Sequence, residues 1–72
     1  MKQLVITKLY DLANIIRTER NAQKMTQLDL ARKARLGINT VALAERGKTT
    51  PSIENLASMA KALGYDEIVV KI

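Results

Sequence analysis

The chain has 72 residues and a formal net charge of +5, with twelve lysines and arginines against seven aspartates and glutamates. It contains no cysteine and no histidine, which excludes disulfides, thiol nucleophiles, imidazole bases and the usual zinc sites. A chain of this length supports one domain with a small core, so dimerisation would help to stabilise it.

The positive charge is concentrated in the middle of the chain. Residues 15–48 carry eight lysines and arginines against three acidic residues, whereas the rest of the chain carries four of each sign. A local excess of basic residues is typical of a nucleic-acid-binding surface. A solvated surface that serves only solubility would show the same pattern, so charge alone does not decide between the two.

The N-terminal segment, residues 1–7, is rich in branched apolar residues, among them Leu4, Val5 and Ile6. It is expected to be either a short strand or a disordered arm. Its apolar part is too short for a signal peptide, and no apolar run approaches the roughly 20 residues that a membrane span needs. We therefore expect a soluble, cytoplasmic protein without membrane contact.

A helix is predicted over residues 9–23, because apolar side chains recur there at helical spacing. These side chains are Leu9, Leu12, Ala13 and Ile16. Arg20 continues the same stripe, where a buried charge is costly unless it is paired. Its guanidinium therefore either pairs with an acidic residue or extends to water.

Two short helices joined by a tight turn are predicted next. Thr26 can cap a helix over 27–34, and Gly37 interrupts the helical period. A second helix over 38–46 ends at Gly47, which suits a left-handed C-terminal cap. The apolar residues of both helices recur at steps of three or four: Leu30, Ala31, Ala34, Val41 and Ala44. This outline is that of a helix-turn-helix.

A further helix is predicted after Ser52, whose hydroxyl can cap it, and Gly64 is expected to end it. Its apolar face comprises Ile53, Leu56, Ala57, Ala60 and Leu63. These positions share one side of a helix, so we expect this face to close the core.

The C-terminal segment alternates in polarity, with Ile68, Val70 and Ile72 on one face, which predicts a strand over 66–72. An isolated strand has an unpaired edge and an apolar face, and it needs a partner. Two arrangements provide one. The strand pairs either with residues 4–6 or with the same strand of a second subunit.

Three motifs carry a family resemblance: TQLDLA from Thr26, TVALAERGK from Thr40 and PSIENLASMAKALG from Pro51. Their order and spacing resemble the Cro and phage-repressor helix-turn-helix family, also called the xenobiotic-response-element family, over residues 10–65. The resemblance implies a mainly α fold, a phage-repressor-like bundle of four to five helices.

A strand in place of the usual fifth helix is closest in layout to HipB-like antitoxins and transcriptional regulators. That likeness implies that the terminal strand pairs across a homodimer, which we take as the leading arrangement. The expected organisation is a single domain over 1–72, with an arm or strand at 1–7, a helical core at 9–64 and the strand at 66–72.

The resemblance also implies which residues contact DNA, because it makes 38–46 the recognition helix that enters the major groove. Asn39 is suited to a bidentate contact with adenine, whereas Ile38 and Leu43 can only touch a thymine methyl group or pack elsewhere. The candidate base readers are Gly37, Ile38, Asn39, Ala42 and Leu43; the candidate phosphate contacts are Gln27, Thr40, Arg46 and Lys48. Gln27 lies in a first helical turn, where free N–H groups and the helix dipole favour a phosphate.

One structural contact follows from the same resemblance. In this family, an arginine at the position of Arg20 bonds the glutamate of the ERG motif, which is Glu45 here. We therefore expect Arg20 and Glu45 to form an ion pair.

The sequence departs from the family pattern at four positions. Arg35 stands where glycine is usual, and Gly37 where a serine or threonine cap is usual, so the turn is expected to be reshaped. Leu43 replaces a polar residue, and Ala44 replaces a large apolar one. Either the helix over 38–46 rotates to bury Leu43, or Leu43 is exposed against DNA or a partner protein.

These observations favour a homodimeric, sequence-specific double-stranded DNA-binding regulator on a palindromic operator. It would be a repressor or an antitoxin-type autorepressor that also binds a toxin protein, located at the nucleoid. The alternative is a protein-interaction or toxin-neutralising module on the same fold. An enzyme is not expected, because Asp66 and Glu67, the adjacent carboxylates, point to opposite faces of a strand. Neither a cofactor nor a metal is expected.

Overall fold

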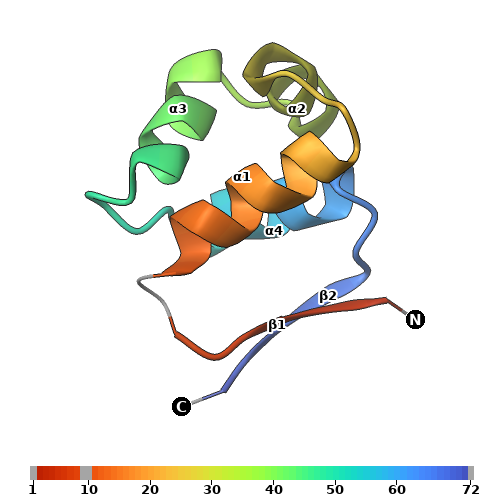
Figure 1. The fold of residues 1–72 in the computed structure, drawn as a ribbon, viewed down its shortest axis with the longest axis vertical. Coiled ribbons are helices and arrows are strands. Elements are labelled where there is room, and N and C mark those ends of the chain that lie inside the picture. Colours follow the sequence, from red (N-terminus) through yellow and green to blue (C-terminus); the bar gives the residue numbers. More distant parts are fainter. Residues whose placement is uncertain (1, 9–10, 72) are drawn as a thin grey trace.

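The computed structural model describes residues 2–8 and 11–71. Within them the mainly α fold with a helix-turn-helix and a C-terminal strand is confirmed. The elements in chain order are β1 (Gln3–Ile6), α1 (Leu12–Ala22), α2 (Gln27–Ala34), α3 (Ile38–Arg46), α4 (Ile53–Ala62) and β2 (Glu67–Val70). The two strands lie at one end of the molecule, α2 and α3 lie at the other end, and α1 and α4 lie between them (Figure 1).

The strands β1 and β2 form a parallel two-stranded sheet, in which Leu4 pairs with Ile68 and Ile6 with Val70. Leu4 and Ile6 are buried, and Ile68 packs against the core. The N-terminal segment is therefore a strand, and β2 finds a partner in its own chain, one of the two arrangements open from the sequence. Within residues 2–8 and 11–71 the other edge of β2 is unpaired. Pairing across a homodimer thus stays a prediction.

The bounds of α2 and α3 are those predicted, and α1 begins later than expected. Leu9 and Tyr10, which were placed in this first helix, lie outside the described residues. Leu12 and Ile16 of α1 are buried, as the periodicity requires. At the start of α4, the amide of Asn55 donates to the Ser52 hydroxyl over 3.1 Å, so Ser52 is the expected cap.

One prediction for α4 is wrong. Ile53, assigned to the core face, is 76% exposed, and Ala57 is exposed as well. The buried stripe runs through Leu56, Met59 and Leu63. At about 100° per residue, Ile53 and Ala57 lie beside this stripe rather than on it. Ile53 is therefore available at the surface.

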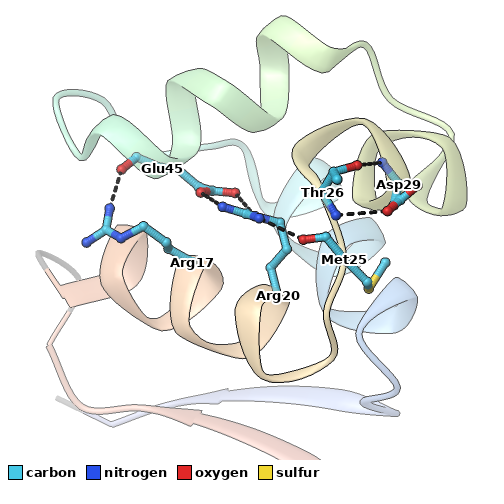
Figure 2. Close-up of polar contacts among 6 residues, drawn as sticks. All are labelled: Arg17, Arg20, Met25, Thr26, Asp29 and Glu45. Carbon is cyan, nitrogen blue, oxygen red and sulfur yellow. Dashed lines mark hydrogen bonds and ion pairs between the residues drawn. The ribbon is translucent and has the colours of Figure 1, made fainter.

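A buried ion pair joins α1 to α3 (Figure 2). Arg20 Nε donates to Glu45 Oε2 over 2.7 Å, and Arg20 Nη2 donates to Glu45 Oε1 over 2.9 Å. A third donor, Arg20 Nη1, reaches the Met25 carbonyl at 2.7 Å. The two side chains are 12% and 4% exposed. Hydrogen bonding to Glu45 raises the pKa of Arg20 despite its burial, so the arginine stays charged and does not extend to water.

The turn between α2 and α3 passes through a left-handed residue that is not glycine. Arg35 adopts the left-handed conformation with φ of 59°. The amide of Leu36 donates to the Ala31 carbonyl over 2.8 Å, the long hydrogen bond of a Schellman motif. Leu36 packs against the core. Arg35 therefore takes the left-handed position of the turn and carries the strain of an L-residue there, and whether the turn is reshaped relative to the family stays a prediction.

Replacing Glu45 with alanine leaves Arg20 as a largely buried charge, with the Met25 carbonyl as its one remaining hydrogen-bond partner among the described residues. We expect this variant to lose about 3–5 kcal/mol of unfolding free energy. Urea denaturation at fixed protein concentration measures it. Arg46→Ala on the same helix removes an exposed charge and is expected to stay within about 0.5 kcal/mol of wild type. A loss below about 1 kcal/mol for Glu45→Ala would show that the pair contributes little.

Replacing Arg35 with glycine removes the left-handed strain of a residue with a Cβ. This strain costs roughly 1–2 kcal/mol. Glycine recovers only part of it, because its greater freedom stabilises the unfolded chain. We expect Arg35→Gly to raise the unfolding free energy by about 0.5–1 kcal/mol in the same denaturation assay. The matched control, Lys33→Gly inside α2, should lower it by about 1 kcal/mol. Equal losses in both variants would argue against strain at Arg35.

Candidate nucleic-acid interface

The predicted base readers lie on the outward side of α3. Ile38 and Leu43 are 44% and 49% exposed, Asn39 is exposed and Ala42 is half-buried. At about 100° per residue, these four positions and Arg46 fall within an arc of roughly 140°. The side of the helix that faces the core, formed by Val41, Ala44 and Glu45, is buried. We call the outward side the α3 face: Ile38, Asn39, Ala42, Leu43 and Arg46.

The orientation of Leu43, which was open from the sequence, is now defined. Ala44 is 3% exposed and fills the core position, while Leu43 points outward. The small Ala44 therefore does not cause α3 to rotate and bury Leu43. The rotation of α3 is set instead by Glu45, because its pairing with Arg20 holds the Glu45 side chain on the inner side of the helix. Two large apolar side chains thus remain on the α3 face.

The N-terminus of α3 is open. Its cap residue Gly37 has extended backbone angles and is exposed. Among the described residues, no side chain caps this end, and the first turn holds no acidic residue. Unpaired N–H groups and the positive end of the helix dipole favour an anion or a base acceptor here. Gly37 also lets another molecule approach the backbone closely.

The N-terminus of α2 is closed instead. The Thr26 hydroxyl accepts from the Asp29 amide over 3.0 Å, and Asp29 Oδ2 accepts from the Thr26 amide over 2.8 Å. These hydrogen bonds, drawn in Figure 2, hold the pKa of Asp29 below its usual value. A negative charge therefore occupies the turn where the dipole was expected to hold a phosphate. The half-buried Gln27 can contact DNA through its side-chain amide.

The C-terminal end of α3 carries exposed positive charge. Arg46 and Lys48 are both exposed, and within the described part of the chain neither is held in a hydrogen bond or ion pair. Gly47 between them is left-handed with φ of 75°, and an added Cβ would lie 3.3 Å from Ala13. Gly47 thus ends α3 in the left-handed conformation, and its missing side chain lets Ala13 of α1 pack closely against it. Thr40, beside a hollow of about 230 Å³, flanks the α3 face and is half-buried.

The contribution of Arg17 was missed in the sequence. Its Nη1 donates to the Glu45 carbonyl over 3.0 Å, and its Nη2 donates to Asn14 Oδ1 over 3.1 Å. A cation at the last carbonyls of a helix stabilises the negative end of its dipole. The signal was present, because Arg17 lies three residues before Arg20 and hence on the same side of α1.

Not all the basic residues of the middle segment surround α3. Lys33 and Arg35 border a hollow between α2 and α4 together with Ser58 and Lys61. The charge count of the sequence therefore overstates the positive charge at the α3 face. In the described part of the chain, no helix is long and apolar enough to cross a membrane.

The comparisons with known proteins agree with this geometry. No curated protein matches the chain significantly. A family model described as helix-turn-helix matches residues 16–69, which include α2, α3, α4 and most of α1 and β2. The match covers well over half of the chain. The protein therefore belongs to the Cro/C1-type helix-turn-helix family of DNA-binding transcription regulators.

Proposed function

We propose that the protein is a sequence-specific regulator that inserts α3 into the major groove of double-stranded DNA. The observation that carries this proposal is the α3 face: an outward side bearing Asn39 and Arg46, fixed in rotation by Glu45, which is buried on the core side of the helix. A major groove about 12 Å wide admits one α-helix with its side chains. The open end at Gly37 supports the same assignment, because recognition helices read bases with residues near their N-termini.

The roles of the base readers follow from their chemistry. The side-chain amide of Asn39 can make two hydrogen bonds with adenine. Its nitrogen donates to N7, and its oxygen accepts from the N6 amino group. Ile38 and Leu43 provide apolar contacts for thymine methyl groups. Gly37 and Ala42 are small and leave room for the bases between these side chains. The proposed half-site is therefore rich in A·T pairs.

The phosphate contacts supply affinity rather than sequence preference. Arg46 and Lys48 have exposed cationic groups at the exit of α3, and neutralising phosphates releases counterions from the duplex. The Thr40 hydroxyl and the Gln27 amide are neutral donors that fix the position of the protein on the backbone. Because Asp29 is negative, Gln27 is proposed to act by its side chain.

We further propose that two copies bind a palindromic operator as a homodimer. The protomer measures 30 × 29 × 21 Å, which is comparable to the roughly 34 Å between equivalent half-sites one turn apart. The open edge of β2, which carries Ile68 and Val70, supports self-association; Ile72, the third residue of the predicted dimer strand, lies outside the described residues. Repression, including autorepression in the manner of an antitoxin with a toxin partner, is the proposed biological role in the cytoplasm and at the nucleoid.

A second candidate function rests on the two apolar residues of the α3 face. Ile38 and Leu43 are exposed, and exposed apolar groups also suit a protein partner. A protein-interaction module would use this face for a partner such as a toxin without specific DNA binding. Salt dependence separates the candidates, because phosphate contacts give a steep loss of affinity with salt.

Selection from a random-sequence duplex library at two salt concentrations tests the proposed function. We expect the retained DNA to be enriched in a palindrome with half-sites about ten base pairs apart, and retention to weaken as salt rises. Retention without an enriched sequence would contradict specific recognition. No retention at either salt concentration would favour the interaction module.

Two substitutions separate base reading from phosphate binding. Asn39→Ala should cost about 1–3 kcal/mol on the selected operator and relax the preference at one position. Arg46→Gln should weaken binding to operator and unrelated duplex alike, and reduce the salt slope by about one. The control Lys61→Gln removes an exposed charge on α4 and should change neither property. Fluorescence anisotropy at several salt concentrations measures all three; equal effects of Asn39→Ala on all sequences would contradict its reading role.

A further inference from the structure

The hollow between α2 and α4 is lined by positive charge, and we call it the cationic hollow. It encloses about 500 Å³ and is open to solvent. Three cationic residues line it: Lys33 from the last turn of α2, Arg35 from the turn that follows, and Lys61 from the last turn of α4. No acidic residue is among its described lining residues. Three segments of the chain thus bring like charges to one place.

These three charges are not compensated within the described part of the chain. Lys33, Arg35 and Lys61 are all exposed, and none of their side chains is held in a hydrogen bond or ion pair within residues 2–8 and 11–71. Like charges around a concave surface repel one another and attract counter-ions. A bound anion therefore relieves a repulsion that the fold itself leaves in place.

The helix ends account for only part of this arrangement. A cation in the last turn of a helix stabilises the negative end of its dipole, which explains Lys33 and Lys61 separately. Arg35 is different, because it adopts the left-handed conformation with φ of 59°, where glycine or asparagine is usual. Strained backbone positions are concentrated at functional sites. The chain thus places a guanidinium at the cationic hollow with a strain that glycine would avoid.

Small and neutral groups complete the lining. Ala34 and Ala62 are buried and line the cationic hollow, and their short side chains leave space between the cations. The half-buried Ser58 adds a hydroxyl group that can donate a hydrogen bond to an anion. A volume of this size is typical of small-molecule sites. The lining suits an anionic ligand rather than an apolar one.

We propose that the cationic hollow binds a small molecule that carries two or three linked phosphate groups. One phosphate group has three acceptor oxygens and a charge of about −1.5 to −2 at pH 7, so linked groups balance three cations and a single group does not. Arg35 binds two phosphate oxygens through its planar fork. Lys33 and Lys61 act as point charges on either side, and the Ser58 hydroxyl donates to a further oxygen.

The cationic hollow is separate from the α3 face. None of the residues that define the α3 face is among the described lining residues of the hollow. A ligand in the hollow therefore leaves the proposed reading side of α3 free for DNA. The inference goes beyond the proposed function, and the two sites can be tested independently.

Titration of ¹⁵N-labelled protein with tripolyphosphate, followed by amide chemical shifts, tests the site without DNA. We expect the amides of residues 33–36 and 58–62 to shift most, because they carry or flank the lining side chains. Citrate, whose carboxylates each accept in one plane, is expected to bind about tenfold more weakly. Shifts concentrated on the α3 face, equal affinity for citrate, or no binding at millimolar tripolyphosphate would each overturn the proposal.

Two left-handed residues provide a matched pair of variants. Arg35 and Lys24 are the described residues other than glycine with positive φ, and of these two only Arg35 lines the cationic hollow. Glycine suits both conformations, so Arg35→Gly and Lys24→Gly each remove one cation and keep the fold. We expect Arg35→Gly to weaken tripolyphosphate binding about tenfold, and Lys24→Gly to weaken it less than about twofold. Equal losses would indicate attraction by net charge alone and overturn the site.

A duplex titration identifies the source of the phosphate groups, because free oligophosphates and the DNA backbone present the same chemistry. We expect duplex DNA to leave the amides of residues 58–62 unshifted. Shifts there as large as those with tripolyphosphate would assign the cationic hollow to the DNA backbone and overturn the small-molecule site. Loss of duplex binding with the tripolyphosphate shifts intact would contradict the proposed function and support the site.

Discussion

The buried ion pair between Arg20 and Glu45 is the constraint on which the rest of the structure depends. Glu45 is charged and lies on the inner side of α3, where only a bidentate partner compensates its desolvation. Arg20 supplies that partner from α1 and also holds the Met25 carbonyl just before α2. One guanidinium therefore connects the three helices of the DNA-binding half. With Glu45 fixed inward, the outward direction of Asn39 and Leu43 follows from helix geometry alone.

The surfaces proposed for DNA and for a second subunit lie at opposite ends of the molecule. The helices α2 and α3 form one end, and the sheet forms the other (Figure 1). DNA and a second subunit would thus not compete for one surface. The two N-termini in the helix-turn-helix are also used differently: α2 is capped by its own Asp29, whereas α3 is left open at Gly37. A capped end stabilises the fold, and an open end is available to a ligand.

Features set by local chemistry could be predicted from the sequence, and features set by distant packing could not. The caps at Thr26, Gly47 and Ser52 fixed helix bounds because each acts within one turn. The exposure of Ile53 depends on which side of α4 meets β2, and the pairing of β2 with β1 joins opposite ends of the chain, so periodicity could not decide either. The left-handed angles of Arg35 could not be predicted from its side chain, because an L-residue adopts them only where the surrounding turn imposes them at a modest cost.

Titration of ¹⁵N-labelled protein with a short DNA duplex at low salt, followed by amide chemical shifts, tests the central claim most directly. If the α3 face enters the major groove, the amides of residues 37–43 and of Arg46 and Lys48 shift on binding, while those of Glu67–Val70 do not. Shifts confined to β2 and α4, with the amides of α3 unchanged, would contradict the account. The DNA-binding surface would then have to be sought away from the helix-turn-helix.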